Sequence, residues 1–350
     1  MKIGRRQGTF AFTWLLIAGV TAAGFALHFS QPDHLLLSVA KRVVGADCSQ
    51  DACRAITECK VVSVDQPDWI NAHNVPEWRL SNTKTGHVDI RSLPNCPYGT
   101  HTGIDTSPDG SKVLCYSSSP NDRPASLVDM QTGRFSLWTP SDDVYHYPVL
   151  WMPDSRRWLS LATVPQGFVT VYHAETPNAP DRIPFPEFRS AVWKDFEVAG
   201  QDRLYVTESF CSDKSGRSAT FTEYRLGAQV ERIALHVVQP PFDVESYRFT
   251  ISPRDDRIAW TCTERRQPGF AQLLHRILPH WSVPMNEIVS LWTSDLDGKD
   301  WREIGHISST VGENASLGFA WLPNGRQISF VHEGVLYIVA DGTQQPGEVN

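Results

Sequence analysis

Short runs of alternating apolar residues return along the chain with the same kind of turn between them. In the clearest copy, two such runs flank the turn Ser107-Pro-Asp-Gly110, and an outer hairpin follows over residues 126–138. Proline presets φ at the turn, and aspartate and glycine accept the conformations that the turn requires. Val113 and Leu114 point to opposite faces of the second strand, as the alternation of a β-strand requires. This stretch therefore predicts two consecutive β-hairpins.

The same pattern of strand, turn, strand and outer hairpin occurs six times. The other copies lie at residues 61–94, 148–161, 191–206 with outer strands near 219–236, 247–260 with 289–304, and 317–330 with 335–342. Six units over roughly 280 residues give about 47 residues each, the period of four-stranded propeller blades. We therefore expect an all-β fold, a β-propeller of six four-stranded blades over residues 60–345. Tryptophans recur at strand positions and are expected to pack between blades: Trp151, Trp193, Trp260, Trp292 and Trp321.

The first thirty residues predict a membrane segment. Three basic residues precede an uncharged, mostly apolar run over residues 7–27. The core of this run is close to the ~20 residues that span a bilayer as a helix. Basic residues on its N-terminal side place the rest of the chain outside the cytoplasm. Residues 1–30 are thus either a retained transmembrane signal-anchor or a cleaved signal peptide, and we expect a periplasmic or extracellular propeller, secreted if cleavage occurs.

Charge and cysteine content agree with that compartment. The net charge of -7 over 350 residues gives no sign of nucleic-acid binding, which favours a basic face. Seven cysteines fit an oxidising environment. Cys48, Cys53 and Cys59 lie in a predicted junction over residues 31–59, and their spacing lacks a Cys-x-x-Cys pair, so disulfides are expected there rather than zinc.

The turn phrase Ser107-Pro-Asp-Gly110 and the stretch Leu291–Ile304 resemble the repeats of TolB-type, WD40-like propellers, and the resemblance covers residues of about 100–342. It implies an extracytoplasmic interaction module, although some such propellers form half of a peptidase. The chain departs from TolB itself, because nothing before residue 60 looks long enough for TolB's separate N-terminal domain.

No motif for a known catalytic centre stands out. Gly-x-Ser-x-Gly, His-Glu-x-x-His, a P-loop and a dinucleotide fingerprint are not found in the sequence. The segment Asp295–Asp300 is similar to a calcium loop, but its twelfth position is His306 instead of glutamate, so it predicts a hairpin turn. We expect no cofactor and no metal, and favour a protein–protein interaction or scaffold module. The alternative is an enzyme or small-ligand receptor that uses the central channel.

Two groups of residues are candidates for binding. Polar residues just before inner strands are expected near one mouth of the channel, as ligand contacts or as ordinary loop residues: His101, Tyr145, His146, Tyr247 and Arg248. The other group lies in an insertion at about 265–286, where six apolar residues share one face of a predicted helix: Phe270, Leu273, Leu274, Ile277, Leu278 and Trp281. This helix either packs against its own propeller, docks a protein partner or lies on the membrane surface.

Overall fold

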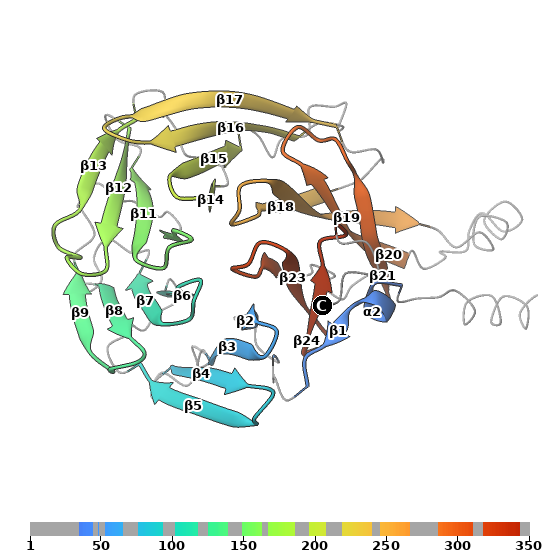
Figure 1. Cartoon of the computed structure of the whole chain (residues 1–350), viewed down its shortest axis with the longest axis horizontal. Coiled ribbons are helices and arrows are strands. Elements are labelled where there is room, and N and C mark those ends of the chain that lie inside the picture. The colour runs from blue at the N-terminus through green and yellow to red at the C-terminus, as the bar shows by residue number, and fades with distance from the viewer. Residues whose placement is uncertain are drawn as a thin grey trace, which may run out of the picture.

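The computed structural model forms a ring of six blades around a central channel (Figure 1). It describes residues 35–44, 48, 53–65, 76–93, 102–117, 125–138, 149–162, 167–185, 196–207, 219–239, 246–266, 286–310 and 318–343. Each blade is a sheet of four antiparallel strands. The predicted all-β, six-bladed propeller is therefore confirmed, while the predicted membrane segment over residues 1–30 lies outside the described residues.

Five blades use four consecutive strands from the inside outwards. Blade 1 contains β2 (Cys53–Thr57), β3 (Lys60–Asp65), β4 (Glu77–Asn82) and β5 (His87–Ser92). Blade 2 contains β6 (Thr102–Thr106), β7 (Lys112–Ser117), β8 (Ala125–Asp129) and β9 (Phe135–Trp138). Blade 3 contains β10 (Leu150–Trp151), β11 (Arg157–Ala162), β12 (Phe168–His173) and β13 (Asp181–Pro184). Blade 4 contains β14 (Phe196–Ala199), β15 (Arg203–Thr207), β16 (Ala219–Leu226) and β17 (Val230–Val238). Blade 5 contains β18 (Ser246–Ile251), β19 (Arg257–Arg266), β20 (Asn286–Asp295) and β21 (Arg302–Thr310).

Blade 6 is closed by the N-terminal part of the described chain. Its inner strands are β22 (Phe319–Trp321), β23 (Gln327–His332) and β24 (Val335–Ala340), and its outermost strand is β1 (Lys41–Arg42). In that pairing Lys41 lies opposite Ile338 and Arg42 lies opposite Tyr337. Two strands, β1 and β2, thus come from the range 31–59 that we expected to be a junction. The sequence offered no alternating apolar pattern for β1, because both of its residues are charged.

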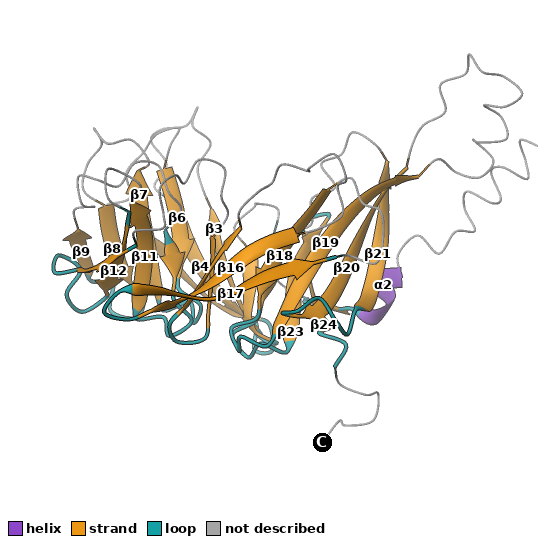
Figure 2. Ribbon diagram, turned by 90° about the horizontal axis from the view of Figure 1, so that it is seen from above, coloured by secondary structure: helices purple, strands orange, loops and turns teal. Residues whose placement is uncertain are grey.

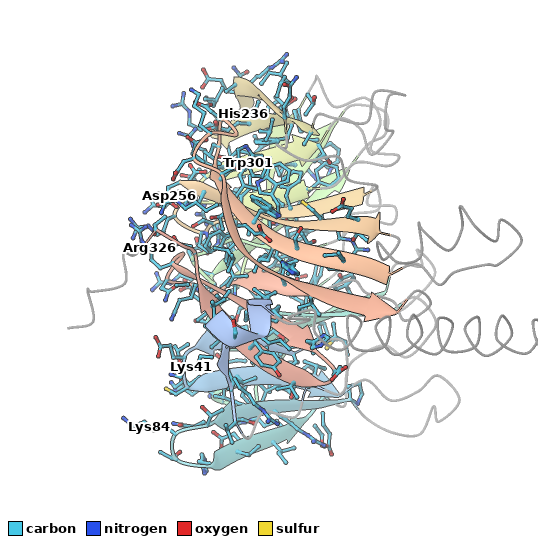
Figure 3. The ribbon with its side chains drawn as sticks, turned by 90° about the vertical axis from the view of Figure 1, so that its right-hand side faces the viewer. Lys41, Lys84, His236, Asp256, Trp301 and Arg326 are labelled. Carbon is cyan, nitrogen blue, oxygen red and sulfur yellow. A yellow bond between two sulfur atoms is a disulfide. The ribbon has the colours of Figure 1, made fainter. Side chains whose placement is uncertain are left out.

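The seam between blades 6 and 1 is also held by side chains. Lys41, labelled in Figure 3, forms an ion pair with Glu58 at 3.2 Å between Nζ and Oε2. The other carboxylate oxygen of Glu58 accepts a hydrogen bond of 2.9 Å from Gln327. An apolar cluster that includes Val43, Ala55 and Leu336 lies beneath them. Glu58 therefore joins the first strand, the first blade and the last blade of the ring.

A short helix, α2 (Leu35–Val39), precedes β1 and packs against β21 of blade 5. Leu36 is fully buried in the apolar cluster between blades 5 and 6. The backbone of α2 approaches Gly305 so closely that a Cβ at this position would lie 2.7 Å from Leu36 Cα. Glycine at position 305 thus allows α2 to dock against β21.

The repeated turns fold as their residue types predict. In blade 2, Asp109 Oδ1 accepts hydrogen bonds from the Ser107 hydroxyl at 2.7 Å and from the Ser111 N–H at 2.9 Å. Gly110 adopts φ 71°, and a Cβ there would overlap Ile56 of blade 1. Figure 2 shows the short loops gathered along one face of the ring.

Each blade buries both of its faces against its neighbours. In β7, Val113 and Cys115 belong to the cluster between blades 1 and 2, whereas Leu114 belongs to the cluster between blades 2 and 3. The opposite orientation predicted for Val113 and Leu114 is confirmed. Aromatic rings fill the second cluster: Trp158 stacks on Tyr172 with ring centroids 5.5 Å apart.

The tryptophans predicted to pack between blades do so where the structure describes them. Trp151, Trp260 and Trp321 are buried in interblade clusters and Trp292 packs against one of them, while Trp193 lies outside the described residues.

A disulfide of the kind predicted for residues 31–59 is also present. Cys48 and Cys53 form a disulfide, and Cys115 is disulfide-bonded as well. Cys59 and Cys262 are free thiols. Within the described residues, no helix is both long and apolar enough to cross a bilayer. The segment Asp295–Asp300 forms the hairpin turn that we predicted, in which Asp295 accepts a 2.6 Å hydrogen bond from the Lys299 N–H.

Candidate ligand site in the central channel

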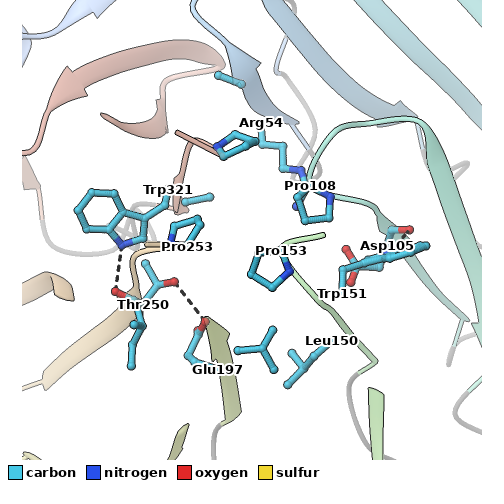
Figure 4. Close-up of a pocket in the computed structure, with 15 residues that line it drawn as sticks. Arg54, Asp105, Pro108, Leu150, Trp151, Pro153, Glu197, Thr250, Pro253 and Trp321 are labelled. Carbon is cyan, nitrogen blue, oxygen red and sulfur yellow. Dashed lines mark hydrogen bonds between the residues drawn. The ribbon is translucent and has the colours of Figure 1, made fainter. Parts of the chain in front are cut away.

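All six blades contribute residues of their inner strands, or of the turns that follow these strands, to a central cavity of about 210 Å³ (Figure 4). Five of the lining residues share one place in the repeat, two positions before the residue that opens the turn: Asp105, Leu150, Glu197, Thr250 and Ala320. Arg54 of β2 completes the ring from blade 1. The cavity is therefore lined by one cationic side chain, two carboxyl groups and several apolar groups.

Prolines of the repeated turns form a large part of the apolar wall. Pro108, Pro153, Pro253 and Pro323 come from blades 2, 3, 5 and 6 and all line the cavity. Prolines in four of the repeated turns thus also shape the channel. The sequence pattern that identified the blades therefore also describes this wall.

Hydrogen bonds and ion pairs between successive inner hairpins hold the wall in place. Around the ring, the partners are Arg54 with the carbonyls of Thr106 and Ser107, Asp109 N–H with Ser155 Oγ (3.0 Å), Arg157 with Asp202 (3.0 Å), Gly200 N–H with Pro253 O (3.2 Å), Ser252 Oγ with Gly325 O (3.2 Å), and Gln327 with Glu58 (2.9 Å). Every pair of neighbouring blades is linked in this way. A cavity with so many cross-links in its wall is preorganised for binding.

Inner-strand side chains add links within the cavity itself. Trp151 donates its indole N–H to Asp105 O at 3.4 Å, and Trp321 donates to Thr250 O at 3.1 Å. The Thr250 hydroxyl donates to Glu197 Oε2 at 3.2 Å, which joins blades 4 and 5 (Figure 4). The bond from Thr250 holds the Glu197 carboxylate in place.

The charged groups perturb one another. Burial raises the pKa of Asp105 to about 6, and the nearby Arg54 guanidinium opposes this shift. Burial also lowers the pKa of Arg54, an effect that Asp105 and Asp109 oppose. Tyr116 lies close by, and burial together with the Asp105 charge raises its pKa to about 12. Asp105 is thus a carboxyl group that can change its charge near neutral pH.

Among the residues predicted for the channel mouth, only Arg248 has a side chain that the structure describes, and it is not among the described residues that line this cavity. His101, Tyr145 and His146 lie outside the described residues, and the side chain of Tyr247 is not described. Arg248 is exposed on β18, two positions before Thr250. The six apolar residues of the predicted insertion helix also lie outside the described residues. These assignments stay predictions.

Sequence reasoning missed Asp105 and Glu197. The signal that could have identified them is their place in the repeat. Each is a charged residue at a position where other blades carry leucine, threonine or alanine, two residues before the start of the turn. Because both residues have the same position relative to the turn of their blade, an alignment of the repeats would have placed both at the same level of the channel.

A second candidate surface lies on the outer rim. Among the described residues, the exposed large apolar side chains are found on outer strands and next to β1: Val39, Val44, Val88, Ile90, Phe135, Leu137, Ile233, Leu235 and Val237. The longest row is on β17, the outermost strand of blade 4, drawn in yellow in Figure 1. Ile233, Leu235 and Val237 are 41%, 47% and 54% exposed and alternate along one face.

The comparisons with known proteins show a similarity of fold and nothing more. No family model matches the chain, and no curated protein matches it. Similar solved structures include TolB from Acinetobacter baumannii (TM-score 0.46, 14% identity, 83% of this chain and 63% of that one). They also include the β-propeller domain of the Trilobed protease from Pyrococcus furiosus (TM-score 0.41, 15% identity, 84% and 83%). A third is an oligogalacturonate lyase in complex with manganese (TM-score 0.46, 10% identity, 86% and 90%). This chain spans less than two thirds of the TolB chain.

Proposed function

We propose that this chain is an interaction module: a propeller outside the cytoplasm, held at the membrane by residues 1–30, that binds a protein partner through its outer rim. The observation that carries the proposal is the row Ile233, Leu235 and Val237 on β17. Exposed apolar rows of this kind mark protein-binding surfaces. The free edge of an outermost strand can also pair with a strand of another chain.

The rest of β17 explains why this row does not serve the fold. On the opposite face of the strand, Val238 is fully buried in the cluster between blades 4 and 5. His236 on that face is nearly buried and lies 3.1 Å from Glu223. One face of β17 thus secures the blade, and the other face is available to a partner.

The disulfide between Cys48 and Cys53 supports a location outside the cytoplasm, because such bonds persist in oxidising compartments. The predicted anchor in residues 1–30 supports attachment to the membrane. The predicted helix over residues 265–286 offers an additional docking surface if it does not pack against its own propeller.

Crosslinking in cells followed by affinity capture tests the proposal. Leu235→Glu places a charge in the apolar row, and Gln229→Glu adds the same charge at an exposed polar position of the same hairpin. We expect the native chain and Gln229→Glu to capture the same partner and Leu235→Glu to lose it. A partner retained by Leu235→Glu but lost on deletion of residues 266–285 would transfer the binding surface to the insertion. Capture of no specific partner by any form would contradict the proposal.

A further inference from the structure

The central cavity combines two carboxyl groups with an apolar wall. Among the described residues that line it, the charged ones are Asp105, Glu197 and Arg54. The guanidinium of Arg54 is already engaged by the carbonyls of Thr106 and Ser107 in blade 2. When both carboxyl groups are ionised, these three described side chains together carry a net charge of -1.

The remaining wall is mainly apolar. It includes Leu150, Val198, Ile251 and the edges of Trp151 and Trp321. The cavity has a volume of about 210 Å³, which is below the roughly 300–1,000 Å³ of pockets that hold drug-sized ligands. A ligand must therefore have few heavy atoms, and its apolar part can contact the wall while its polar end reaches a carboxylate.

From this combination we propose that the channel binds a small organic cation, a primary ammonium or guanidinium group on a short aliphatic stem. The carboxylate of Glu197 is the main acceptor, since the Thr250 hydroxyl holds it in place with a 3.2 Å hydrogen bond while each carboxylate oxygen can accept further donors. Asp105 supplies the second negative charge. Hydrogen bonds between ionised groups are stronger than neutral ones, and the buried setting increases their strength.

A metal ion fits the site less well. Among the residues whose positions are described, no three His, Cys, Asp or Glu side chains are grouped as metal ligands. The hydrophobic wall would also leave most coordination positions of an ion such as Ca²⁺ without oxygen ligands. An organic cation satisfies both the carboxylates and the wall.

Binding should depend on pH. Burial raises the pKa of Asp105 to about 6, so this group is ionised at pH 8 and protonated at pH 5. Among the described residues, the other titratable groups that interact with Asp105 are Arg54 and Tyr116, and neither changes charge in this interval because the pKa of Tyr116 is about 12 and arginine stays protonated. Glu197 lines the same cavity. The affinity for a cation should therefore fall as the pH falls through about 6.

Calorimetric titration of the full chain with n-butylammonium at pH 8 tests this inference, with 1-butanol as the neutral probe of the same shape. We expect saturable binding of butylammonium, at least about tenfold weaker in Glu197→Gln because a charge-assisted hydrogen bond is lost. Glu175→Gln removes one carboxylate from an exposed turn and should bind like the native chain. Leu150→Trp fills the cavity without a change of charge and should abolish binding.

Three results would overturn the inference: no saturable binding at pH 8, equal affinity for 1-butanol, or equal weakening in Glu175→Gln. Thermal melts show whether each variant is folded. If Glu197→Gln does not fold, the pH series on the native chain still decides the matter, since affinity that is unchanged between pH 8 and pH 5 contradicts a role for Asp105.

Discussion

Replacement of Gly305 by alanine should displace the helix α2 from the propeller. A Cβ at position 305 would lie 2.7 Å from Leu36 Cα and 2.8 Å from Leu36 N. Both are backbone atoms, which cannot move aside by a rotamer change. The substitution Gly305→Ala must therefore shift either α2 or β21.

The cost follows from what α2 buries. Leu36 is 0% exposed, and full exposure of such a side chain costs about 1.5–3 kcal/mol. Leu37 and Ala40 are partly buried against the same cluster and would lose contacts too. We therefore expect Gly305→Ala to lower the free energy of unfolding by at least about 2 kcal/mol.

Urea denaturation at 25 °C, followed by tryptophan fluorescence, measures this loss. Gly318→Ala is the matched control, because a Cβ at position 318 meets no atom within 4 Å. The control should be as stable as the native chain or slightly more so, since alanine restricts the unfolded chain. Equal denaturation midpoints for the two variants would refute the reasoning.

A double-mutant cycle separates displacement of α2 from a local effect on β21. Leu36→Ala alone should cost about 2–5 kcal/mol, as for other fully buried leucines. If Gly305→Ala acts by displacing Leu36, the double variant should cost little more than the larger of the two single changes. A strictly additive cost would show that the two residues act independently.

Three further predictions concern the channel and the disulfide. Asp105→Asn should raise the melting temperature at pH 8, because the native chain has a buried, ionised carboxylate at this pH, above its folded-state pKa of about 6. This gain in melting temperature should vanish as the pH falls towards 4, and an equal gain at both pH values would contradict the prediction. Trp321→Phe should lower the free energy of unfolding in urea by about 1–3 kcal/mol, because the Thr250 carbonyl loses a hydrogen bond of 3.1 Å. Trp151→Phe should lower it by less, because the hydrogen bond that is lost is longer, at 3.4 Å. The reverse order would contradict this reasoning. Reduction of Cys48–Cys53 should cost about 2 kcal/mol, as expected for a short loop. Because the reductant also breaks the disulfide of Cys115, a variant in which Cys48 and Cys53 are alanine should still be destabilised by reduction, but by about 2 kcal/mol less than the native chain.

The propeller could be predicted because its signal is local and repeated. A turn such as Ser107-Pro-Asp-Gly110 needs only its own residues to form, and it returns in several blades in nearly the same form. The strand β1 could not be predicted in this way. It consists of Lys41 and Arg42, and its position depends on the pairing with β24 at the other end of the described chain.

The channel site illustrates a second limit. Asp105 and Glu197 are unremarkable within their own blades, and they become a site only because the ring brings equivalent positions together. Arg54 was hidden for an additional reason, because β2 lies inside the range expected to be a junction. A charged residue at one position of a repeat indicates a binding site only when the equivalent positions of all blades are compared.

The closure of blade 6 by β1 joins the two ends of the described chain, which matters for folding. Among the strand pairings of the described residues, that of Lys41 with Ile338 spans the largest sequence separation, so it can form only after almost the whole chain is available. Loop-closure entropy makes such contacts slow to form. Until β24 is available, β1 has no partner strand, and an incomplete ring would expose strand edges and apolar surface that can attract other chains. Pairing of β24 with β1 therefore completes the ring and removes the exposed edges that favour aggregation.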